Sequence, residues 1–431
     1  MLYLRNGYMI DPLSKEEGYR DILIDTRIGR IVRIALCGEQ AACAASCKEI
    51  DLNGQIVAPG LVDVHVHFRD PGFTHKEDIH TGAAAAAKGG FTSVVLMANT
   101  KPPVDNKETL SYVLDKGRET GIRVYTCANV TKGLQGKELT DMEALSEQGA
   151  AGFTDDGVAL MDETLLRTAL RRAAKCKKPV SLHEENPAFI KNNGVNAKKA
   201  AAFYGIGGSP REAEISLVER DLRIAAEEGA DLCVQHISTK EAVELVRQAK
   251  KESGHVFAEA TPHHFTLTEE AVIEHGTLAK MNPPLREEAD RMAIIEGLRD
   301  GTIDMIATDH APHSAEEKAK PITEAPSGII GLETALSLGI RELVDKGYLS
   351  MMELIEKMSL APAKLYHLDA GYLKEGGPAD LVVFDPKKEW VVKNFVSKAA
   401  NSPFVGERMP GVVSYTICGG KAAHGDIEKF S

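Results

Sequence analysis

Aromatic residues and positive charges are scarce in this chain of 431 residues. Aromatic residues make up 5% of the chain and there is one tryptophan, so a stack of rings for binding nucleic-acid bases is not expected. The 63 Asp and Glu residues outnumber the 51 Lys and Arg residues, which gives a formal net charge of −12. Because nucleic acids and anionic membranes repel an acidic protein, we expect neither of them as a partner.

Long hydrophobic runs are also missing. Charges or glycines interrupt the most apolar windows before they reach the roughly 18 residues that a membrane-spanning helix requires. The opening residues, Met-Leu-Tyr-Leu-Arg-Asn-Gly, contain no basic region followed by an apolar stretch, so we expect no signal peptide. These features predict a cytoplasmic protein.

The cysteines are few and scattered, at positions 37, 43, 47, 127, 176, 233 and 418. Cys43 and Cys47 lack the second pair that would complete a structural zinc site. We therefore expect reduced thiols, and a disulfide among positions 37, 43 and 47 is the alternative.

The two ends of the chain share one pattern. Residues 1–58 contain short apolar runs separated by turn signals such as Asn6-Gly7, a pattern typical of β-strands. Near the other end, the apolar runs 378–385 and 411–418 predict strands again. We predict that residues 1–58 and 368–431 fold together as one smaller, discontinuous β domain.

The central part, residues 59–367, predicts the fold class. Eight apolar runs of strand length alternate with helical stretches over roughly 250 residues, which is typical of an α/β protein with a (β/α)₈ TIM-like barrel. An open, doubly wound sheet is the alternative, but no glycine fingerprint for a dinucleotide follows the first strand. Strands are expected near 61–67, 91–97, 122–127, 150–154, 179–183, 231–236, 256–260 and 303–308, and helices near 77–88, 107–119, 141–148, 162–176, 212–228, 240–251 and 287–298.

The first of these strands carries a His-Val-His motif at positions 65–67. Since alternate residues of a strand face the same side, we expect Asp63, His65 and His67 on one face. Val62, Val64 and Val66 are expected on the other. Two imidazoles two residues apart on a rigid strand can bind one metal ion, although an isolated motif of this kind is more often an inert, hydrogen-bonded pair.

Other polar residues stand where the remaining strands end, and barrel active sites lie at this edge. A lone histidine there is more often structural, and an aspartate before a helix is more often an N-cap. Burying all of these groups at one barrel mouth without partners would be costly, whereas metal ions satisfy them together. Imidazoles and carboxylates suit Zn²⁺, and six ligands are enough for two ions. The candidates are Asp155, Asp156, His183, His236 and Asp309.

His65, His67, His183, His236 and Asp309 together resemble the pattern of the amidohydrolase superfamily. Longer motifs resemble the class I bacterial dihydroorotases, and the resemblance extends over essentially the whole chain. These motifs occupy positions 65–72, 99–100, 153–157, 236–240, 261–264, 281–286 and 308–313.

The resemblance implies two zinc ions per chain. His65 and His67 would bind the first ion, His183 and His236 the second, and Asp156 would bridge them. Asp309 would contact the first ion and act as the catalytic proton shuttle. The residues alone do not distinguish Asp156 from its neighbour Asp155.

The resemblance also implies a set of substrate contacts. Arg69, Asn99 and Asn282 would bind a substrate carboxylate, with His67 also on the substrate side. His313 would contact the pyrimidine edge from the loop after the last strand. Ser327 and Gly328 would add contacts through their backbone. The family often has an aromatic side chain at the position of Ser327, so no side-chain contact is expected from this serine.

The implied reaction is the reversible interconversion of L-dihydroorotate and N-carbamoyl-L-aspartate in de novo pyrimidine biosynthesis. A hydroxide that bridges the zinc ions would attack the ring amide, and Asp309 would carry its proton to the departing nitrogen. Another cyclic amidase is the alternative (a hydantoinase, dihydropyrimidinase or allantoinase), but many of those bridge their metals with a carboxylated lysine, which Thr154-Asp155-Asp156 lacks. An inactive scaffold is the second alternative. We expect a homo-oligomer, and some class I relatives associate with aspartate carbamoyltransferase.

Overall fold

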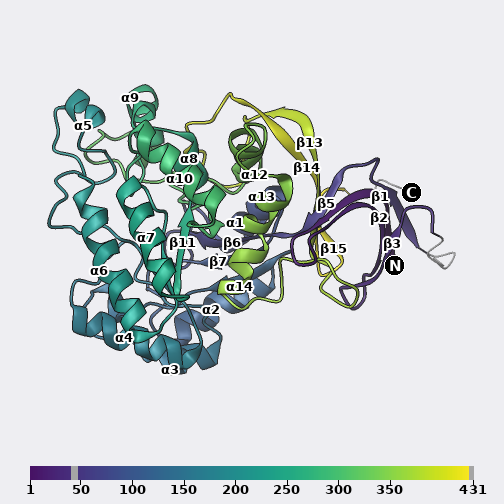
Figure 1. The fold of residues 1–431 in the computed structure, drawn as a ribbon, viewed down its shortest axis with the longest axis horizontal. Coiled ribbons are helices and arrows are strands. Elements are labelled where there is room, and N and C mark those ends of the chain that lie inside the picture. Colours follow the sequence, from purple (N-terminus) through teal and green to yellow (C-terminus); the bar gives the residue numbers. More distant parts are fainter. Residues whose placement is uncertain (40–46, 427–431) are drawn as a thin grey trace.

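The computed structural model of the protein describes residues 1–39 and 47–426. A helical body and a β-sheet lie side by side, and the sheet contains strands from both ends of the sequence (Figure 1). Cys37, Cys127, Cys176, Cys233 and Cys418 are free thiols, as expected. Cys47 takes part in a disulfide, so the expectation of reduced thiols is wrong at that position. Position 43 lies outside the described residues.

The helical body is the expected parallel barrel. Single residue pairs join its two sheets: Phe153 pairs with Ala128 and Val180, and His310 pairs with Val66. The prediction of a (β/α)₈ barrel is confirmed, although the expected strand at 150–154 is reduced to the pairing at Phe153. The strands are β6 (Leu61–Val66), β7 (Phe91–Leu96) and β8 (Arg123–Thr126) in one sheet, and β9 (Val180–Leu182), β10 (Leu232–Val234), β11 (Val256–Ala260) and β12 (Met305–Ile306) in the other.

Helices follow most of these strands and cover the outside of the barrel (Figure 1). The longer ones are α1 (Ile79–Lys88), α2 (Lys107–Arg118), α3 (Met142–Gln148), α4 (Glu163–Cys176), α6 (Glu212–Glu228), α7 (Lys240–Glu252), α10 (Glu288–Asp300) and α13 (Met351–Met358). Short helices also lie in the loops and after the last strand, namely α5 (Lys199–Tyr204), α8 (Pro262–Thr266), α9 (Glu270–His275), α11 (Ala315–Lys318), α12 (Ala335–Gly339) and α14 (Leu360–Leu365).

The strand β6 departs from simple alternation. Its pairing with β7 shifts register between Asp63 and Val66. Val62 and Val64 pack in the same cluster as Tyr366, at the end of α14, whereas Val66 packs with Phe68 in the larger core. The expectation that the three valines share one face is therefore wrong at Val66, because the irregular register turns the end of the strand.

The β-sheet beside the barrel has eight strands in the order β15-β14-β13-β5-β1-β2-β3, with β4 paired to β1. The C-terminal part joins the N-terminal part where β13 pairs antiparallel with β5. Leu4, Ile22, Val57, Val383 and Ile417 pack within its own hydrophobic core. The strands are β1 (Leu2–Asp11), β2 (Glu16–Asp25), β3 (Arg30–Leu36), β4 (Lys48–Asp51), β5 (Ile56–Pro59), β13 (Leu381–Val391), β14 (Arg408–Cys418) and β15 (Lys421–His424).

Asn6 and Gly7 do not form the turn that the sequence predicted. Both lie inside β1, where the register with β2 shifts between Leu4 and Gly7. A Cβ atom on Gly7 would lie 2.6 Å from the Val57 side chain and 2.9 Å from that of Leu52. The glycine therefore permits the close approach of neighbouring chain segments, which a sequence signal cannot distinguish from a turn.

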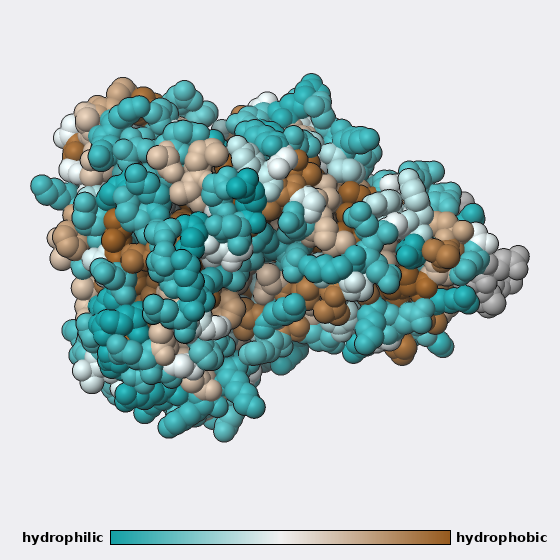
Figure 2. Space-filling model, viewed as in Figure 1, coloured by the Kyte–Doolittle hydropathy of each residue, from teal (hydrophilic) through white to brown (hydrophobic). Residues whose placement is uncertain are grey.

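Figure 2 shows a mostly hydrophilic face over the barrel helices and more hydrophobic residues around the junction with the sheet. Exposed large hydrophobic side chains also lie on the β-sheet, including Tyr19, Ile28, Val32 and Leu36. Within residues 1–39 and 47–426, no helix is both long enough and apolar enough to cross a bilayer.

Asp380 connects the sheet to the barrel. Its carboxylate accepts hydrogen bonds from Arg123 Nε at 2.6 Å and Nη2 at 3.2 Å, and from the Gly419 amide at 2.6 Å. Its carbonyl oxygen accepts one from the Gly60 amide at 3.0 Å. We propose the division into a β domain of residues 1–58 and 368–431 and a barrel of residues 59–367, with Asp380 at their junction.

We expect Asp380→Ala to lower the free energy of unfolding by about 2–3 kcal/mol, because it leaves the Arg123 guanidinium and the Gly419 amide without their buried acceptor. Urea unfolding followed by circular dichroism measures this change. Glu389→Ala is the matched control, because Glu389 forms an exposed ion pair with Arg408 in the same sheet. Equal effects of the two substitutions would contradict the role of Asp380.

Candidate active site

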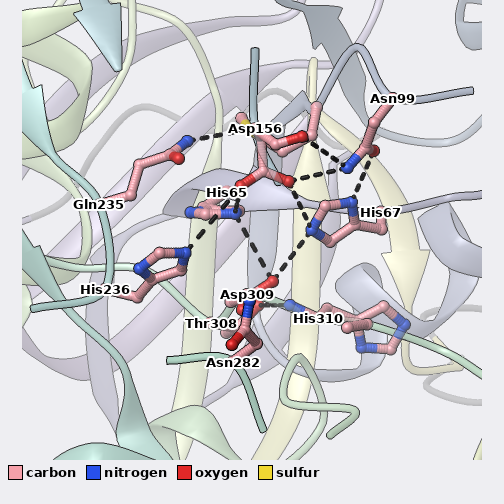
Figure 3. Close-up of polar contacts among 12 residues, drawn as sticks. His65, His67, Asn99, Asp156, Gln235, His236, Asn282, Thr308, Asp309 and His310 are labelled. Carbon is pink, nitrogen blue, oxygen red and sulfur yellow. Dashed lines mark hydrogen bonds and ion pairs between the residues drawn. The ribbon is translucent and has the colours of Figure 1, made fainter. Parts of the chain in front are cut away.

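Four histidines and two aspartates meet at one end of the barrel. Figure 3 shows His65, His67, His236, Asp156 and Asp309 pointing toward one another. His65 lies in β6 and His67 directly follows it, while His183 follows β9 and His236 follows β10. Asp309 follows β12, and all these side chains are buried. This placement at the carboxyl ends of parallel strands is the one expected for a barrel active site.

The first group consists of His65, His67 and Asp309, as the sequence predicted. The Oδ1 atom of Asp309 lies 3.5 Å from His65 Nε2 and 3.0 Å from His67 Nε2. One potential ligand atom from each residue lies within 4.8 Å of the others. Two ligand atoms that bind one tetrahedral zinc at roughly 2.0–2.2 Å lie about 3.3 Å apart, so these separations suit a shared ion.

Asp156 faces all four histidines. Its Oδ1 atom lies 3.6 Å from His65 Nε2 and 3.9 Å from both His183 Nδ1 and His236 Nε2. Its Oδ2 atom lies 3.5 Å from His67 Nε2. A carboxylate in this position can reach ions on both sides of the cluster.

Asp155, which the sequence alone did not distinguish from Asp156, points away from the histidines. Its carboxylate accepts hydrogen bonds from the backbone amides of Val130 at 2.9 Å and Thr131 at 3.1 Å, and from the Thr131 hydroxyl. Burial raises the pKa of Asp155, against the effect of these donors. The carboxylate holds the loop after β8 and does not face the histidines.

His183 and His236 lie together, as predicted, but they are hydrogen-bonded to each other, with 2.9 Å between Nδ1 and Nε2. A second potential metal group contains His65, Asp156 and His236, whereas His183 lies beside it. His183 Nε2 also lies 3.1 Å from Asn282 and 3.4 Å from Glu185. The two groups share His65, and the assignment of His183 and His236 to a second ion stays a prediction.

Two imidazole nitrogens in the cluster are buried without a hydrogen-bond partner, namely Nε2 of His65 and Nδ1 of His236. Orphaned polar atoms in a protein interior are costly. A bound cation would relieve that cost at His65 Nε2, which faces two carboxylates at distances beyond a hydrogen bond. The donor set is of the nitrogen and oxygen type that binds zinc, so the residues fit a metal.

The charges in the cluster support the same interpretation. Burial lowers the pKa of His65, but the carboxylates of Glu259 and Asp309 outweigh it and hold that pKa well above its usual value. Burial, together with the charges of His183 and His65, holds the pKa of His236 well below its usual value. The carboxylates around His65 thus favour positive charge at this position, which a bound metal would supply.

Glu259 is a site residue that the sequence analysis missed. It lies in β11, and its carboxylate accepts a hydrogen bond from His65 Nδ1 and one from the His236 amide at 3.3 Å. Because a carboxylate fixes the tautomer and orientation of a metal-binding histidine, Glu259 holds Nε2 of His65 toward the cluster. A single glutamate within an apolar strand gave no sequence signal that could have identified it.

Positive φ angles mark the backbone around the cluster. His236 has φ +30°, Asp309 has φ +46° and Arg69 has φ +59°. Such angles are strained for residues other than glycine and persist where the surroundings fix them. Asp63 contributes to this fixation, because its buried carboxylate accepts the amides of His65 and Thr308 and so joins the first and last strands.

A cavity of about 370 Å³ opens above the cluster. The predicted residues His67, Arg69, Asn99, Asn282, His313 and Ser327 all line it. Asn193, Lys280 and Met281 also line it, and the sequence analysis did not predict these three. Of the predicted metal ligands and substrate contacts, all but His65 and Gly328 line this one cavity.

Asn99 and Asn282 lie between the two sets. The Asn99 amide donates to Asp156 Oδ2 at 2.8 Å, and its oxygen lies 3.0 Å from His67 Nδ1 (Figure 3). Asn282 donates to His183 Nε2, while its own oxygen is buried without a partner. Both amides thus hold cluster residues, and Asn282 retains a free acceptor.

Arg69 and His313 form one wall of the cavity. Arg69 Nε donates to the carbonyl of Pro312 at 3.3 Å, and its Nη2 lies 3.4 Å from His313 Nε2. Within the described parts of the chain, no carboxylate lies close enough to form an ion pair with Arg69. Burial and the charges of Arg69 and Lys76 lower the pKa of His313 to about 2, so its ring is neutral at physiological pH.

Of the last two predicted substrate contacts, Ser327 lines the cavity and Gly328 does not. The Ser327 carbonyl accepts a hydrogen bond from His313 Nε2 at 2.9 Å, and its hydroxyl lies 3.2 Å from Asn193 Oδ1. Gly328 is outside the set of residues that line the cavity, and its amide donates to the Lys280 carbonyl at 2.9 Å. With φ +156°, Gly328 allows the chain to pass against His313, because a Cβ there would lie 2.7 Å from the imidazole.

Solved structures similar to this chain include hydantoinases and dihydropyrimidinases. The L-hydantoinase (dihydropyrimidinase) from Arthrobacter aurescens superposes with a TM-score of 0.87 at 26% identity, covering 98% of this chain and 95% of that one. A D-hydantoinase superposes with a TM-score of 0.85 at 22% identity, covering 99% and 95%. The second likeness shows the fold alone.

Curated relatives are more similar. A family model described as "Dihydro-orotase-like" matches residues 54–242. The dihydroorotase of Clostridioides difficile (strain 630) is 54% identical over 424 residues, covering 98% of this chain and 100% of the relative. The dihydroorotase of Clostridium acetobutylicum is 49% identical over 428 residues, covering 99% and 100%. Since relatives at this identity span the whole chain, the protein belongs to the dihydroorotase family.

Proposed function

We propose that this protein is a metal-dependent dihydroorotase that interconverts L-dihydroorotate and N-carbamoyl-L-aspartate. One observation carries the proposal: the cavity combines the metal-binding cluster with Arg69, a guanidinium that has no carboxylate partner among the described residues. The cluster supplies hydrolytic chemistry, and the guanidinium suits the substrate carboxylate. The family of the chain supports the same assignment.

His65, His67, His183, His236, Asp156 and Asp309 would hold the metal, which we propose to be two zinc ions bridged by Asp156. When bound, zinc polarises a carbonyl group and lowers the pKa of a water molecule from ~15.7 toward ~7. The His183–His236 hydrogen bond must give way for both rings to act as ligands. Glu259 keeps His65 oriented throughout.

Asp309 is the group that we propose moves the proton. In the hydrolytic direction the oxygen of water adds to the ring carbonyl carbon, and the bond from that carbon to the ring nitrogen breaks. The Asp309 carboxylate takes the proton released by the water and returns it to the departing nitrogen. Acid–base assistance of this kind contributes roughly 10²–10⁴-fold to the rate.

The substrate carboxylate would lie against the Arg69 guanidinium. Asn99 and Asn282 would bind it through their side-chain NH2 groups, which here donate to Asp156 and His183. A guanidinium can bind a carboxylate through two parallel hydrogen bonds. We propose that His313, which is neutral, donates or accepts at the pyrimidine edge, and that the Ser327 backbone contributes beside it. Gly328 lets the chain pass close to the His313 imidazole, because it has no Cβ atom.

A hydantoinase or another cyclic amidase is the weaker candidate. The structural neighbours with those titles share the fold, but the relatives at 48–54% identity carry the name dihydroorotase. The segment that provides Asp156 contains no lysine to act as a carboxylated bridge. An inactive scaffold is also disfavoured, because all six proposed ligand residues are in place.

Several finer features remain our proposals from the sequence. These are the identity of the metal as zinc, its number of two per chain, a cytoplasmic location, a homo-oligomeric state and an association with aspartate carbamoyltransferase. Size-exclusion chromatography with light scattering, alone and with that enzyme, measures the last two.

The purified protein is expected to hydrolyse L-dihydroorotate, with about two zinc ions per chain determined on the same sample by mass spectrometry. Removal of the metal with a chelator should abolish hydrolysis, and zinc should restore it, because the cluster alone lacks a Lewis acid. Zinc without this activity would redirect the assignment to a different cyclic amide. Neither zinc nor activity after zinc is added would favour the scaffold.

Arg69→Lys should raise the KM for L-dihydroorotate roughly 10- to 100-fold, because an ammonium cannot reproduce the two parallel hydrogen bonds of a guanidinium. The bound zinc should not change, since the hydrogen-bond contacts of Arg69 among the described residues are with Pro312 and His313 and not with a metal-binding side chain. Steady-state kinetics and metal analysis on one preparation measure both quantities. Unaltered kinetics, or loss of zinc, would refute a carboxylate-binding role.

Glu259→Gln should weaken metal binding roughly 10- to 100-fold, because it removes the charge that orients His65 and raises its basicity. Competition with a fluorescent zinc chelator measures the affinity. Glu269→Gln is the control, since Glu269 is also buried but accepts the Ala200 amide at 3.0 Å, away from the cluster. Unchanged affinity in Glu259→Gln would show that the carboxylate does not act through His65.

A further inference from the structure

One wall of the cavity is a loop, residues 312–328, that closes at its base. Ala311 and Ile329 meet there through a hydrogen bond of 3.0 Å from the Ala311 amide to the Ile329 carbonyl. His313 and Ser327 stand near the two ends of the loop and face the cavity. The positions of these side chains therefore depend on what holds the loop.

Two buried lysines hold the middle of this loop. Neither forms an ion pair with a carboxylate within the described residues, and both donate to backbone carbonyl oxygens instead. The distances are 2.7 to 3.0 Å, from Lys280 Nζ to Ile322 and Ala325 and from Lys318 Nζ to Pro326 and Gly328. Lys318 thus also holds Gly328 at one end of the loop, and a further residue holds both ends.

That residue is Asn401, which belongs to neither the loop nor the barrel strands. Its side-chain amide donates to the carbonyl oxygens of Ala311 at 3.0 Å and Gly328 at 2.9 Å. Its side-chain oxygen accepts the amide of His313 at 3.0 Å, and its own carbonyl accepts the amide of Ile330 at 3.1 Å. Asn401 is 3% exposed, so water cannot replace these bonds without opening the structure.

Asn401 comes from the segment 392–407, which connects β13 and β14 of the sheet. This segment is itself fixed to the barrel by two buried glutamates. Glu333 accepts the amides of Val396 at 2.8 Å and Ser397 at 3.1 Å, and Glu77 accepts the Ser397 hydroxyl. The connection between two strands of the β-sheet thus reaches the mouth of the barrel.

We propose that Asn401 is a positioning residue for the substrate. It fixes the backbone at His313, and His313 Nε2 in turn lies 3.4 Å from Arg69 Nη2. The Arg69 guanidinium also rests on the carbonyl of Pro312, within the same stretch of backbone. Asn401 therefore determines where the imidazole and the guanidinium stand in the cavity, and this inference rests on the proposed function.

The contacts separate this role from a role in metal binding. Within the described residues, the side chain of Asn401 forms hydrogen bonds with Ala311, His313 and Gly328 at the loop ends and none with the histidine cluster. Its removal is expected to disturb substrate binding and to leave the metal in place. A merely structural residue would instead change the stability of the whole protein and leave KM unaltered.

Two variants test the proposal. Asn401→Ala removes all three side-chain hydrogen bonds, while Asn401→Asp keeps the acceptor for His313 but places a carboxylate against the carbonyls of Ala311 and Gly328. Both should raise the KM for L-dihydroorotate about tenfold, with little change in kcat or in bound zinc. Asn394→Ala is the matched control, because Asn394 is an exposed asparagine in the same segment.

Hydrogen exchange of the backbone, measured without substrate, tests the loop itself. Amides of residues 311–330 should exchange faster in both Asn401 variants than in the wild type and in Asn394→Ala, while the barrel strands keep their protection. In an Arg69→Lys background, Asn401→Ala should add less than about threefold to KM, since both changes act through one contact.

An unchanged KM in both variants would overturn the proposal, whether or not the loop exchanges faster. Loss of zinc together with a fall in kcat would also overturn it, because Asn401 would then act on the metal centre. If the wild type does not hydrolyse L-dihydroorotate, the proposed function fails by itself, and unchanged loop exchange in the variants would separately refute Asn401 as the residue that holds the loop.

Discussion

Four imidazoles and two carboxylates lie buried within a few ångströms of one another at the mouth of the barrel, and much of the surrounding structure keeps them there. Without a counter-charge such a cluster is costly to bury. Glu259 offsets part of this cost by accepting a hydrogen bond from His65, whereas the strained backbone angles at His236 and Asp309 add to it. Asp63 ties the first and last strands together beneath the cluster. The rigidity of closed parallel strands is what allows six polar groups to hold this spacing.

The ligand side of the site could be predicted from the sequence because strand ends are local features. A histidine or aspartate directly after an apolar run must lie at the carboxyl edge of a parallel barrel, and this is where His183, His236 and Asp309 are found. The helices of the barrel were predictable for a similar reason, and α6 has the expected bounds of 212–228. Failures occurred where tertiary contacts override local signals. Asn6 and Gly7 lie within a strand, and the fourth barrel strand is reduced to one residue, Phe153, which pairs with Ala128 and Val180.

Asp155 and Asp156 show most clearly what could not be predicted from the sequence, because they are chemically identical neighbours. Their difference lies in partners that are distant in sequence: the amides at 130 and 131 take the first carboxylate, and the histidines surround the second. Glu259 and Asn401 were missed for the same reason. Each is a single polar residue whose role depends on groups roughly 70 to 190 residues away along the chain. A sequence signal needs a repeated or contiguous pattern, and neither residue has one.

The two halves of the site therefore depend on different kinds of structure. The metal side is built on strand ends, whose positions follow from the closure of the barrel. The substrate side is built on a loop, and a loop of this length has many conformations unless side chains from elsewhere select one. Lys280 and Lys318 select the course of its middle, and Asn401 selects the course of its ends. Because Asn401 comes from the connection between β13 and β14, the discontinuous β-sheet reaches the cavity that holds Arg69 and His313. This gives a physical reason for the β-sheet to remain joined to the barrel: the segment that completes the substrate wall is itself fixed by Glu77 and Glu333 on the barrel.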